Sequence, residues 1–142
     1  MKLFKKMKDG GAESTVTGYW LCEFKSLFSI VLLKFEGPSR NAYHQHAFNC
    51  INWLLKGRLE EWEYAPPNKR FTHRVPRLNT RFRRTLFPSW KPFQIKRTDF
   101  HKVDAPDVSW VLSFRGPWAK TWKEYLPDEN RERTLTHGRI EV

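Results

Sequence analysis

Three histidines of this chain have the type and spacing of metal ligands. His44 and His46 are separated by one residue, and His101 lies far along the chain. On an extended segment, residues i and i+2 point to the same face, so both imidazoles can reach one point. A third imidazole from a distant strand would complete a three-nitrogen face on an ion whose other positions stay open, and neutral imidazoles suit Fe, Ni, Cu or Zn. We therefore predict a divalent metal site at these three residues.

The alternative is a protein in which the histidines serve packing or hydrogen bonding and no metal is bound. Cys50, four residues after His46, is expected to be a small buried residue rather than a fourth ligand. Glu61 and Glu63 alternate on one strand face, where an acid–base pair could form. We expect a solvated strand face there instead.

Concentrated positive charge is the second feature with functional meaning. The chain carries a net charge of +11, and residues 66–102 hold eleven Lys and Arg against one acid, Asp99. Arg81-Phe82-Arg83-Arg84 interleaves an aromatic ring with arginines, a composition that suits single-stranded nucleic acid or a nucleotide. A solvated basic surface explains the same residues without a ligand. The candidate anion-binding residues are Arg70, Arg81, Arg83, Arg84 and Lys91.

The elements that must position these residues are predicted to be β-strands. Runs of β-branched and aromatic residues are separated by turn signals such as Glu36-Gly37-Pro38-Ser39. Residues 118–126 fit either a short helix or an edge strand, and residues 65–92 are expected to form a long loop over one mouth of a barrel. The predicted strands are residues 16–24, 27–35, the histidine segment, 51–55, 59–64, 93–96, 100–103 and 108–114.

Short strands at this spacing indicate an all-β sandwich or barrel. The 142 residues fit one domain, 1–142, with a barrel core at about 16–118. A polar C-terminal extension, about 119–142, is expected to pack loosely after Pro127. No run of ~18 apolar residues exists, so no membrane partner is expected. The two cysteines suit a reducing cytosol.

The stretch from Gly37 to Gly57 resembles the first motif of the cupin superfamily, small jelly-roll barrels. It runs glycine, six residues, His44-x-His46, three residues, Cys50, six residues, glycine. The second cupin motif contributes one more histidine, and His101 lies where it would be expected. The resemblance covers about residues 27–117 and implies a single-domain cupin-type jelly roll with a long basic loop. It departs from the family at Cys50, where many cupins place a glutamate ligand.

A closer likeness is to a group of small cupin-like proteins of tailed bacteriophages. It implies a protein made in the cytoplasm of an infected bacterium, and the group lends no established activity. The strings that carry it are Lys8-Asp9-Gly10-Gly11, Lys25-Ser26-Leu27-Phe28, Tyr43-His44-x-His46-Ala47-Phe48-Asn49, Arg115-Gly116-Pro117-Trp118 and Leu135-Thr136-His137-Gly138-Arg139.

Three histidines with a cysteine also resemble the thiol dioxygenases, cupins that use Fe(II) and O₂. That likeness favours Fe(II) over Zn, Ni or Mn, and it implies pocket roles for Tyr43, Cys50, Arg40 and Tyr125. One hypothesis is therefore a metal-dependent oxygenase acting on a small anionic or thiol substrate. The other is a non-catalytic phage accessory protein that binds a host protein, nucleotide or nucleic acid through residues 66–102. Resemblance to cupins makes a homodimer the default assembly.

Overall fold

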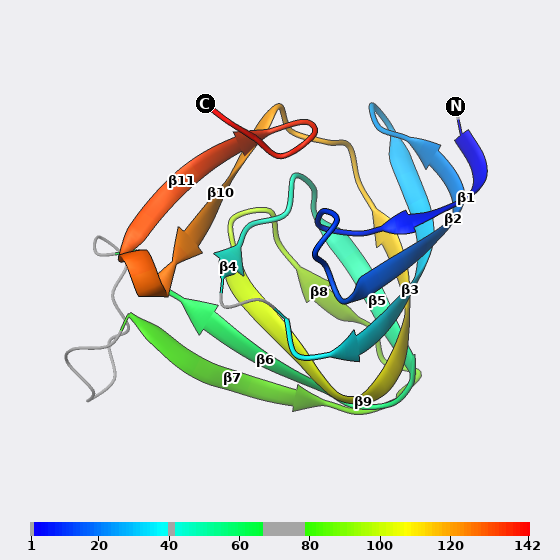
Figure 1. Cartoon of the computed structure of the whole chain (residues 1–142). Helices are drawn as coiled ribbons and strands as arrows, with labels where there is room; N and C mark the ends of the chain where they lie inside the picture. Colours follow the sequence, from blue (N-terminus) through cyan, green and yellow to red (C-terminus); the bar gives the residue numbers. More distant parts are fainter. Residues whose placement is uncertain (1, 40–41, 67–78) are drawn as a thin grey trace.

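Alternating buried and exposed residues give this chain its strands, which close into a barrel (Figure 1). The computed structural model describes residues 2–39, 42–66 and 79–142, and all strand pairs within these ranges are antiparallel. The strands are β1 (Lys2–Lys8), β2 (Val16–Phe24), β3 (Phe28–Gly37), β4 (Tyr43–His44), β5 (Cys50–Lys56), β6 (Leu59–Tyr64), β7 (Thr80–Leu86), β8 (Phe93–Ile95), β9 (Phe100–Arg115), β10 (Thr121–Leu126), β11 (Arg131–Thr136) and β12 (Ile140–Glu141), with a 3-10 turn, η2, at Pro127–Glu129.

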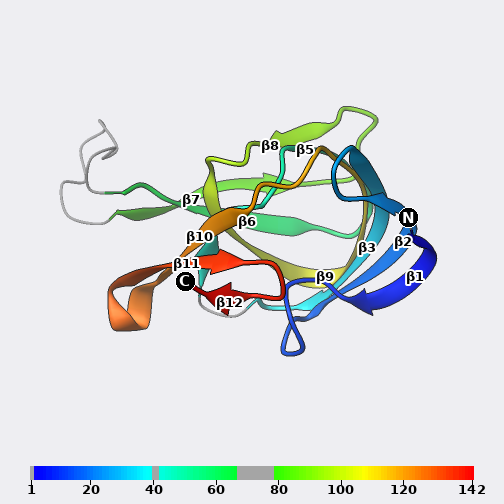
Figure 2. The same ribbon diagram turned by 90° about the horizontal axis from the view of Figure 1, so that it is seen from above.

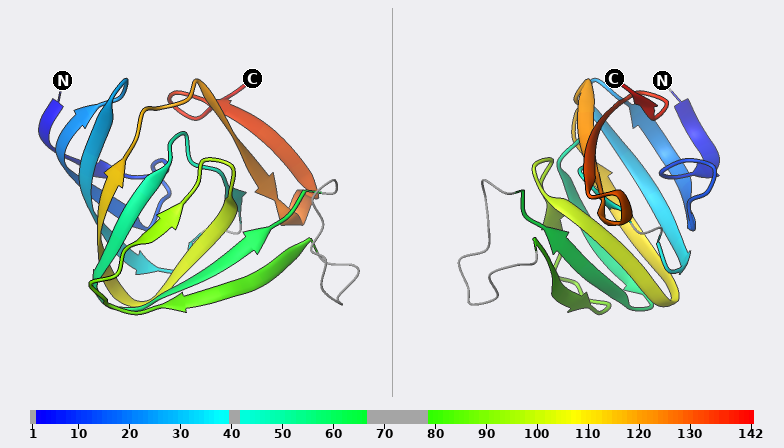
Figure 3. Two further views of the ribbon diagram at one scale, coloured as in Figure 1. Left: turned by 180° about the vertical axis from the view of Figure 1, so that it is seen from behind. Right: turned by 60° about the vertical axis from the view of Figure 1, so that its left-hand side comes forward.

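The barrel consists of two sheets that share β9. One sheet has the order β1-β2-β3-β9-β5-β8, and the other has the order β7-β6-β9-β4-β10-β11-β12. Seen from above, the strands surround one interior (Figure 2). Seen from behind, β5 and β8 form the near wall, on the side away from β12 and the turn after β1 (Figure 3). This arrangement is the all-β jelly roll that the sequence predicts.

The long strand β9 turns a corner between the two sheets. Its first half pairs with β6 and β4, and its second half pairs with β3 and β5. Pro106, which has no N–H to give to a ladder, lies between the halves. The sequence predicts separate strands at 100–103 and 108–114, but the chain passes through the proline as one curved strand (Figure 1).

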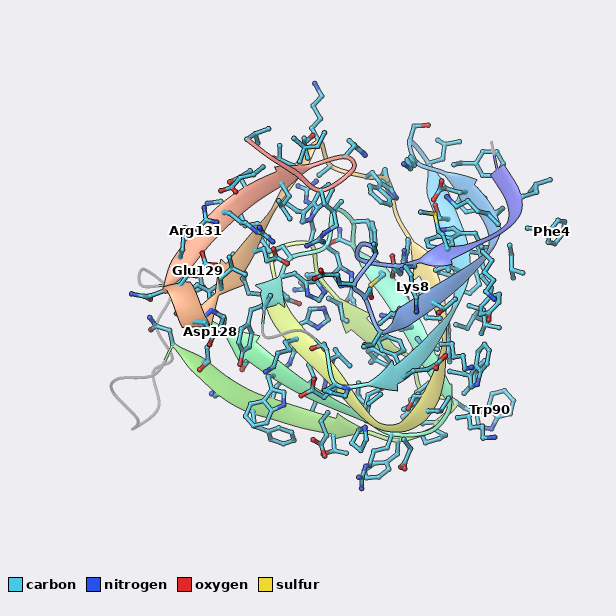
Figure 4. All side chains as sticks on the ribbon, in the orientation of Figure 1. Phe4, Lys8, Trp90, Asp128, Glu129 and Arg131 are labelled. Atoms are coloured by element: carbon cyan, nitrogen blue, oxygen red, sulfur yellow. The ribbon has the colours of Figure 1, made fainter. Side chains whose placement is uncertain are left out.

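The core lies between the two sheets. Its main cluster includes Trp20, Val31, Leu54, Leu59 and Val111, all nearly inaccessible to solvent. Some large apolar side chains lie instead on the outer face of the barrel, exposed to solvent. Phe4 and Trp90 point away from the barrel, with relative exposures of 82% and 96% (Figure 4).

Gly57 closes the turn between β5 and β6 at a place where no other residue fits. Its φ is +94°, and an added Cβ would lie 2.2 Å from Ser109 Oγ and 2.6 Å from Ser109 Cα. Ser109 in turn accepts a hydrogen bond from the Arg58 backbone N–H and donates one to a backbone carbonyl of this region. The glycine therefore lets the β5–β6 turn pack directly on β9.

Several segments outside the predicted strands are also strands. β1 extends the first sheet, and β11 and β12 extend the second. The expectation of a loosely packed end after Pro127 is wrong, because Leu135 is fully buried in β11. Residues 121–126, for which the sequence fits a helix or a strand, form β10. Within the segment expected to be a loop, residues 80–86 form β7 against β6, and residues 67–78 lie outside the described part of the chain.

No helix in the described part of the chain has the length and apolar character needed to cross a membrane.

Candidate metal centre

The backbone register brings the three histidines to one place. His44, at the end of β4, pairs directly with His101, near the start of β9. His46 follows His44 by two residues in an extended segment, so its ring stacks on that of His44 with centroids 5.1 Å apart and planes 2° apart. The i, i+2 geometry expected from the sequence is therefore present, and the third ring comes from across the sheet.

The three rings present their Nε2 atoms to one another. Nε2 of His46 lies 3.2 Å from Nε2 of His44 and 2.9 Å from Nε2 of His101. All three residues offer a nitrogen within 4.8 Å of the others, which makes them a candidate ligand set for one ion. His101 is buried, whereas His44 and His46 are partly exposed toward the cavity described below.

A buried carboxylate fixes the orientation of His101. Its Nδ1 lies 2.9 Å from Oε2 of Glu61, whose side chain is completely inaccessible to solvent. Glu61 is also bound by Arg84 at 2.9 Å and by Arg83 at 3.4 Å. Burial alone would raise the pKa of Glu61, but the hydrogen bond and charge of His101 and the charges of both arginines hold it below the ordinary value. An ionised Glu61 keeps the proton of His101 on Nδ1 and leaves the Nε2 lone pair facing the other histidines.

Glu61 corrects an expectation drawn from the sequence. A solvated face was predicted for Glu61 and Glu63, but a bulge between Glu61 and Trp62 separates their environments. Glu61 shares the inward face of β6 with Leu59, and that i, i+2 relation to a core leucine is the signal that could have identified it.

Cys50 lies behind His46 rather than on the Nε2 side. Its Sγ is 3.8 Å from Nδ1 of His46 and accepts a hydrogen bond from Nδ2 of Asn52 at 3.3 Å. Burial raises the pKa of the Cys50 thiol, which keeps it protonated. Cys50 therefore contacts the far side of a histidine and does not point at the place where the three Nε2 atoms meet.

His46 is held in the neutral form that binds metals. Burial lowers the pKa of His46 well below its ordinary value, and the charges of His101, His44 and Arg115 lower it further. A neutral imidazole keeps a lone pair for coordination.

The three histidines line a cavity of about 640 Å³. Its walls combine aromatic side chains with positively charged ones, and Arg115 at the end of β9 is the most deeply buried of the latter. The aromatic side chains that line it are Trp20, Phe35, Phe48, Phe93, Trp118 and Trp122.

Tyr43, Cys50 and Tyr125, pocket residues implied by the thiol dioxygenase likeness, do not gather at the three Nε2 atoms. Tyr43 and Tyr125 pack with Tyr64 in a separate cluster, because Tyr43 neighbours His44 on a strand and so faces the opposite side. Burial raises the pKa of Tyr43, which stays a neutral phenol. Cys50 is covered by His46, and Arg40 lies outside the described residues.

The basic residues of β7 are engaged by acids of β6. Arg81 binds Glu63, and Arg83 and Arg84 bind Glu61, as described above. Phe82 is half exposed and packs edge-on against Trp62. Lys91 is exposed, and Arg70 lies outside the described residues. Part of the positive charge of residues 66–102 is thus neutralised within the molecule.

Two cavity residues had no role in the sequence analysis. Arg115 and His137 were named only within the sequence strings on which the expected phage likeness rests. His137 stacks on Trp118 with ring centroids 5.4 Å apart and lines the cavity, although the residue is exposed. Arg115 alternates with the buried residues Ser113 and Val111, and this alternation could have placed it on the inward face of β9.

Comparisons with known proteins identify the fold. No protein-family model and no curated protein matches the sequence. Among solved structures, a sugar phosphate isomerase from a cupin superfamily of Silicibacter pomeroyi matches with a TM-score of 0.59 at 11% identity, over 100% of this chain and 92% of that one. An acetylacetone dioxygenase from Acinetobacter johnsonii matches with a TM-score of 0.52 at 14% identity, over 96% of this chain and 78% of that one. The Fe(II) form of HppE matches with a TM-score of 0.53 at 11% identity, over 78% of this chain and 55% of that one. The barrel has the cupin fold, and at these identities the likeness extends to the fold alone.

Proposed function

We propose that this chain is an enzyme that binds one divalent metal ion, Fe(II) in the first instance, on His44, His46 and His101, and that it uses dioxygen to oxidise a small molecule held in the cavity. One observation carries the proposal. The three Nε2 atoms meet on the cavity wall, and a buried carboxylate orients one of the rings.

The donor set fits a transition metal better than Ca²⁺ or Mg²⁺. All three donors are imidazole nitrogens, whereas Ca²⁺ and Mg²⁺ prefer oxygen ligands. The protein also supplies the outer partner that metal-bound histidines commonly have, in the Nδ1 contact of His101 with Glu61. When bound, an ion on three imidazoles supplies a Lewis acid and, for Fe(II), an electron donor to dioxygen at its open positions.

The protein's own side chains position the substrate and exclude water. Phe48 packs edge-on against His46 at 5.2 Å, so the wall beside the histidines is apolar. Trp118 lies against Phe48 at 5.3 Å and continues that wall toward the mouth, where His137 stacks on it. A substrate seated there would lose its hydration against aromatic surface while keeping one end near the three Nε2 atoms.

Two of the similar folds support the choice of Fe(II), since their names include an Fe(II) enzyme and a dioxygenase. The sugar phosphate isomerase shows that the same fold serves another chemistry. Metal identity is therefore the first quantity to measure. The likeness to phage proteins implies that the reaction takes place in an infected bacterium, which stays a prediction.

Metal analysis after anaerobic reconstitution tests the proposal. Tag-free protein is incubated separately with Fe(II), Zn(II), Ni(II) and Mn(II), desalted, and analysed by mass spectrometry of the metal. We expect one Fe(II) ion per chain in the wild type and a loss of most of it in His44→Ala and His101→Ala. His137→Ala is the matched control, because it removes a cavity histidine outside the cluster and should retain the ion. Equal, negligible metal in all four proteins would refute the proposal.

A further inference from the structure

Arg115 places a permanent positive charge deep in the cavity that holds the three histidines. It ends β9 and pairs with Ser29 of β3 on one side and Cys50 of β5 on the other. Its side chain is only 2% exposed, yet it lines the cavity. A guanidinium stays charged at all physiological pH values, and burying it is costly unless an anion accompanies it.

The anion that accompanies Arg115 is a carboxylate from the rim of the cavity. Oδ2 of Asp9 accepts from Nη2 at 2.7 Å, and Oδ1 lies 3.5 Å from Nη1. The guanidinium lies over the Phe48 ring, with Cζ 4.7 Å from its centroid, and 5.8 Å from the ring of Trp20. Nε is buried and has no hydrogen-bond partner among the described residues. One donor of a buried, charged group is therefore left unsatisfied by Asp9.

Asp9 lies in a glycine-containing turn, from which a ligand can displace its side chain. It follows β1 in a turn with Gly10 and Gly11, both with positive φ, and its side chain is 30% exposed, whereas Arg115 is buried. The carboxylate of Asp9 thus reaches inward from solvent to meet a fixed guanidinium. A second carboxylate entering the cavity has the same shape and charge and can replace it.

Arg115 and one histidine of the cluster contact the same aromatic ring. Phe48 contacts the His46 ring at 5.2 Å and the Arg115 guanidinium at 4.7 Å. A small molecule lying along Phe48 can therefore place one end at Arg115 and the other at the three Nε2 atoms.

We propose that Arg115 binds the carboxylate of the substrate in place of Asp9, so that the substrate is a small organic acid with an apolar body lying along Phe48. The inference rests on the proposed function for what happens at the other end of that acid. A carboxylate is chosen over a phosphate because the group that occupies the guanidinium in the structure is itself a carboxylate.

Binding of simple acids to the metal-free protein tests the proposal without any reaction. Phenylacetate, acetate and inorganic phosphate are titrated while the Nε–Hε resonances of the arginines are recorded by two-dimensional NMR. The Arg115 resonance is assigned by its absence in Arg115→Lys. We expect phenylacetate to shift this resonance in the wild type and to bind about tenfold more tightly to Asp9→Asn, because the internal competitor is gone.

Two variants of the same cavity serve as controls. Glu23→Gln also removes one negative charge from the lining, but Glu23 binds Lys5 at 3.1 Å and not Arg115, so phenylacetate affinity should stay within about twofold of the wild type. Arg139→Lys changes another lining arginine, which binds Glu124, and should also retain binding. Arg115→Lys should lose binding, since a lysine cannot reproduce the planar fork.

Three results would overturn the proposal. The first is an unchanged Arg115 resonance at saturating acid, and the second is an equal gain in affinity in Asp9→Asn and Glu23→Gln. The third is binding of phosphate but not of phenylacetate, which would reject the carboxylate class. Should Arg115→Lys fail to fold, the comparison of Asp9→Asn with Glu23→Gln still decides. Because metal content is measured separately, loss of the metal site and loss of the acid site can be told apart.

Discussion

Glu61 Oε2 and His101 Nδ1 lie 2.9 Å apart in a part of the barrel that solvent does not reach. This contact joins the three-histidine cluster to the charged strand pair β6–β7, because the same carboxylate binds Arg84 and Arg83. The orientation of one candidate ligand therefore depends on ion pairs that lie outside the cavity.

Glu61→Gln should weaken metal binding while the three histidines stay in place. An amide is a poorer acceptor for His101 Nδ1 and carries no charge, and loss of such an outer partner costs about 10–100-fold in metal affinity. Competition with a coloured chelator measures this constant. Glu63→Gln is the control, since the Glu63 carboxylate is bound by Arg81 and Arg83. Equal affinities of Glu61→Gln and wild type would contradict the role assigned to Glu61.

Cys50→Ser should leave the metal content unchanged. Sγ of Cys50 lies on the Nδ1 side of His46, away from the other two Nε2 atoms. The same reconstitution used for the histidine variants measures the outcome. If Cys50→Ser lost the ion to the extent expected for His44→Ala, Cys50 would be a ligand and the geometry described here would be incomplete.

Gly57→Ala should destabilise the barrel more than Gly37→Ala. Both glycines have positive φ, +94° and +85°, which costs an alanine about 1–2 kcal/mol. Only at Gly57 does the new Cβ also collide with Ser109, so a further loss of about 1–3 kcal/mol is expected from overpacking. Urea unfolding of the two variants gives the difference directly, and equal midpoints would argue against this close packing on β9.

Arg84→Gln should lower stability and metal affinity together. Glu61, fully buried, would lose its closer arginine partner and keep Arg83 and His101, and the loss of a hydrogen bond to a charged group costs about 1.5–3 kcal/mol. Lys91→Gln removes an equal charge from an exposed site and should leave both quantities unchanged.

The same two variants address nucleic-acid binding by residues 66–102, which stays a prediction. A steep loss of single-stranded oligonucleotide binding in Lys91→Gln, with salt dependence, would favour that function. A loss confined to Arg84→Gln would follow from the damaged fold instead.

Local pattern was sufficient to predict most strands. Val16–Phe24 has the predicted bounds, because alternation and the turns beside it are signals carried by neighbouring residues. The first strand was not predicted, since lysines occupy much of Lys2–Lys8 and its pairing with β2 decides its form. Pro106 suggested a break in β9, but long-range pairing on both sides of it keeps the strand continuous.

The candidate site was predictable only in part for the same reason. His44 and His46 could be paired from their spacing, and His101 from the motif that it resembles. Glu61 and Arg115 could not be linked to them, because their contacts depend on the register between β6 and β9 and on the turn that carries Asp9. Sequence pattern predicts which face of a strand a residue occupies, but it does not predict which residues of other strands that face contacts.

One continuous backbone carries His101 near its start and Arg115 at its end, and the corner at Pro106 lies between them. If both proposals hold, the shape of β9 determines the length of substrate that can reach from Arg115 to the ion. The bend of β9 at Pro106 sets the distance between Arg115, which would bind the carboxylate, and the ion. Substitutions near Pro106 would therefore change the length of the organic acid that fits, although they touch neither end of it. Selectivity among acids could then evolve at the corner while every side chain that touches the substrate stays the same.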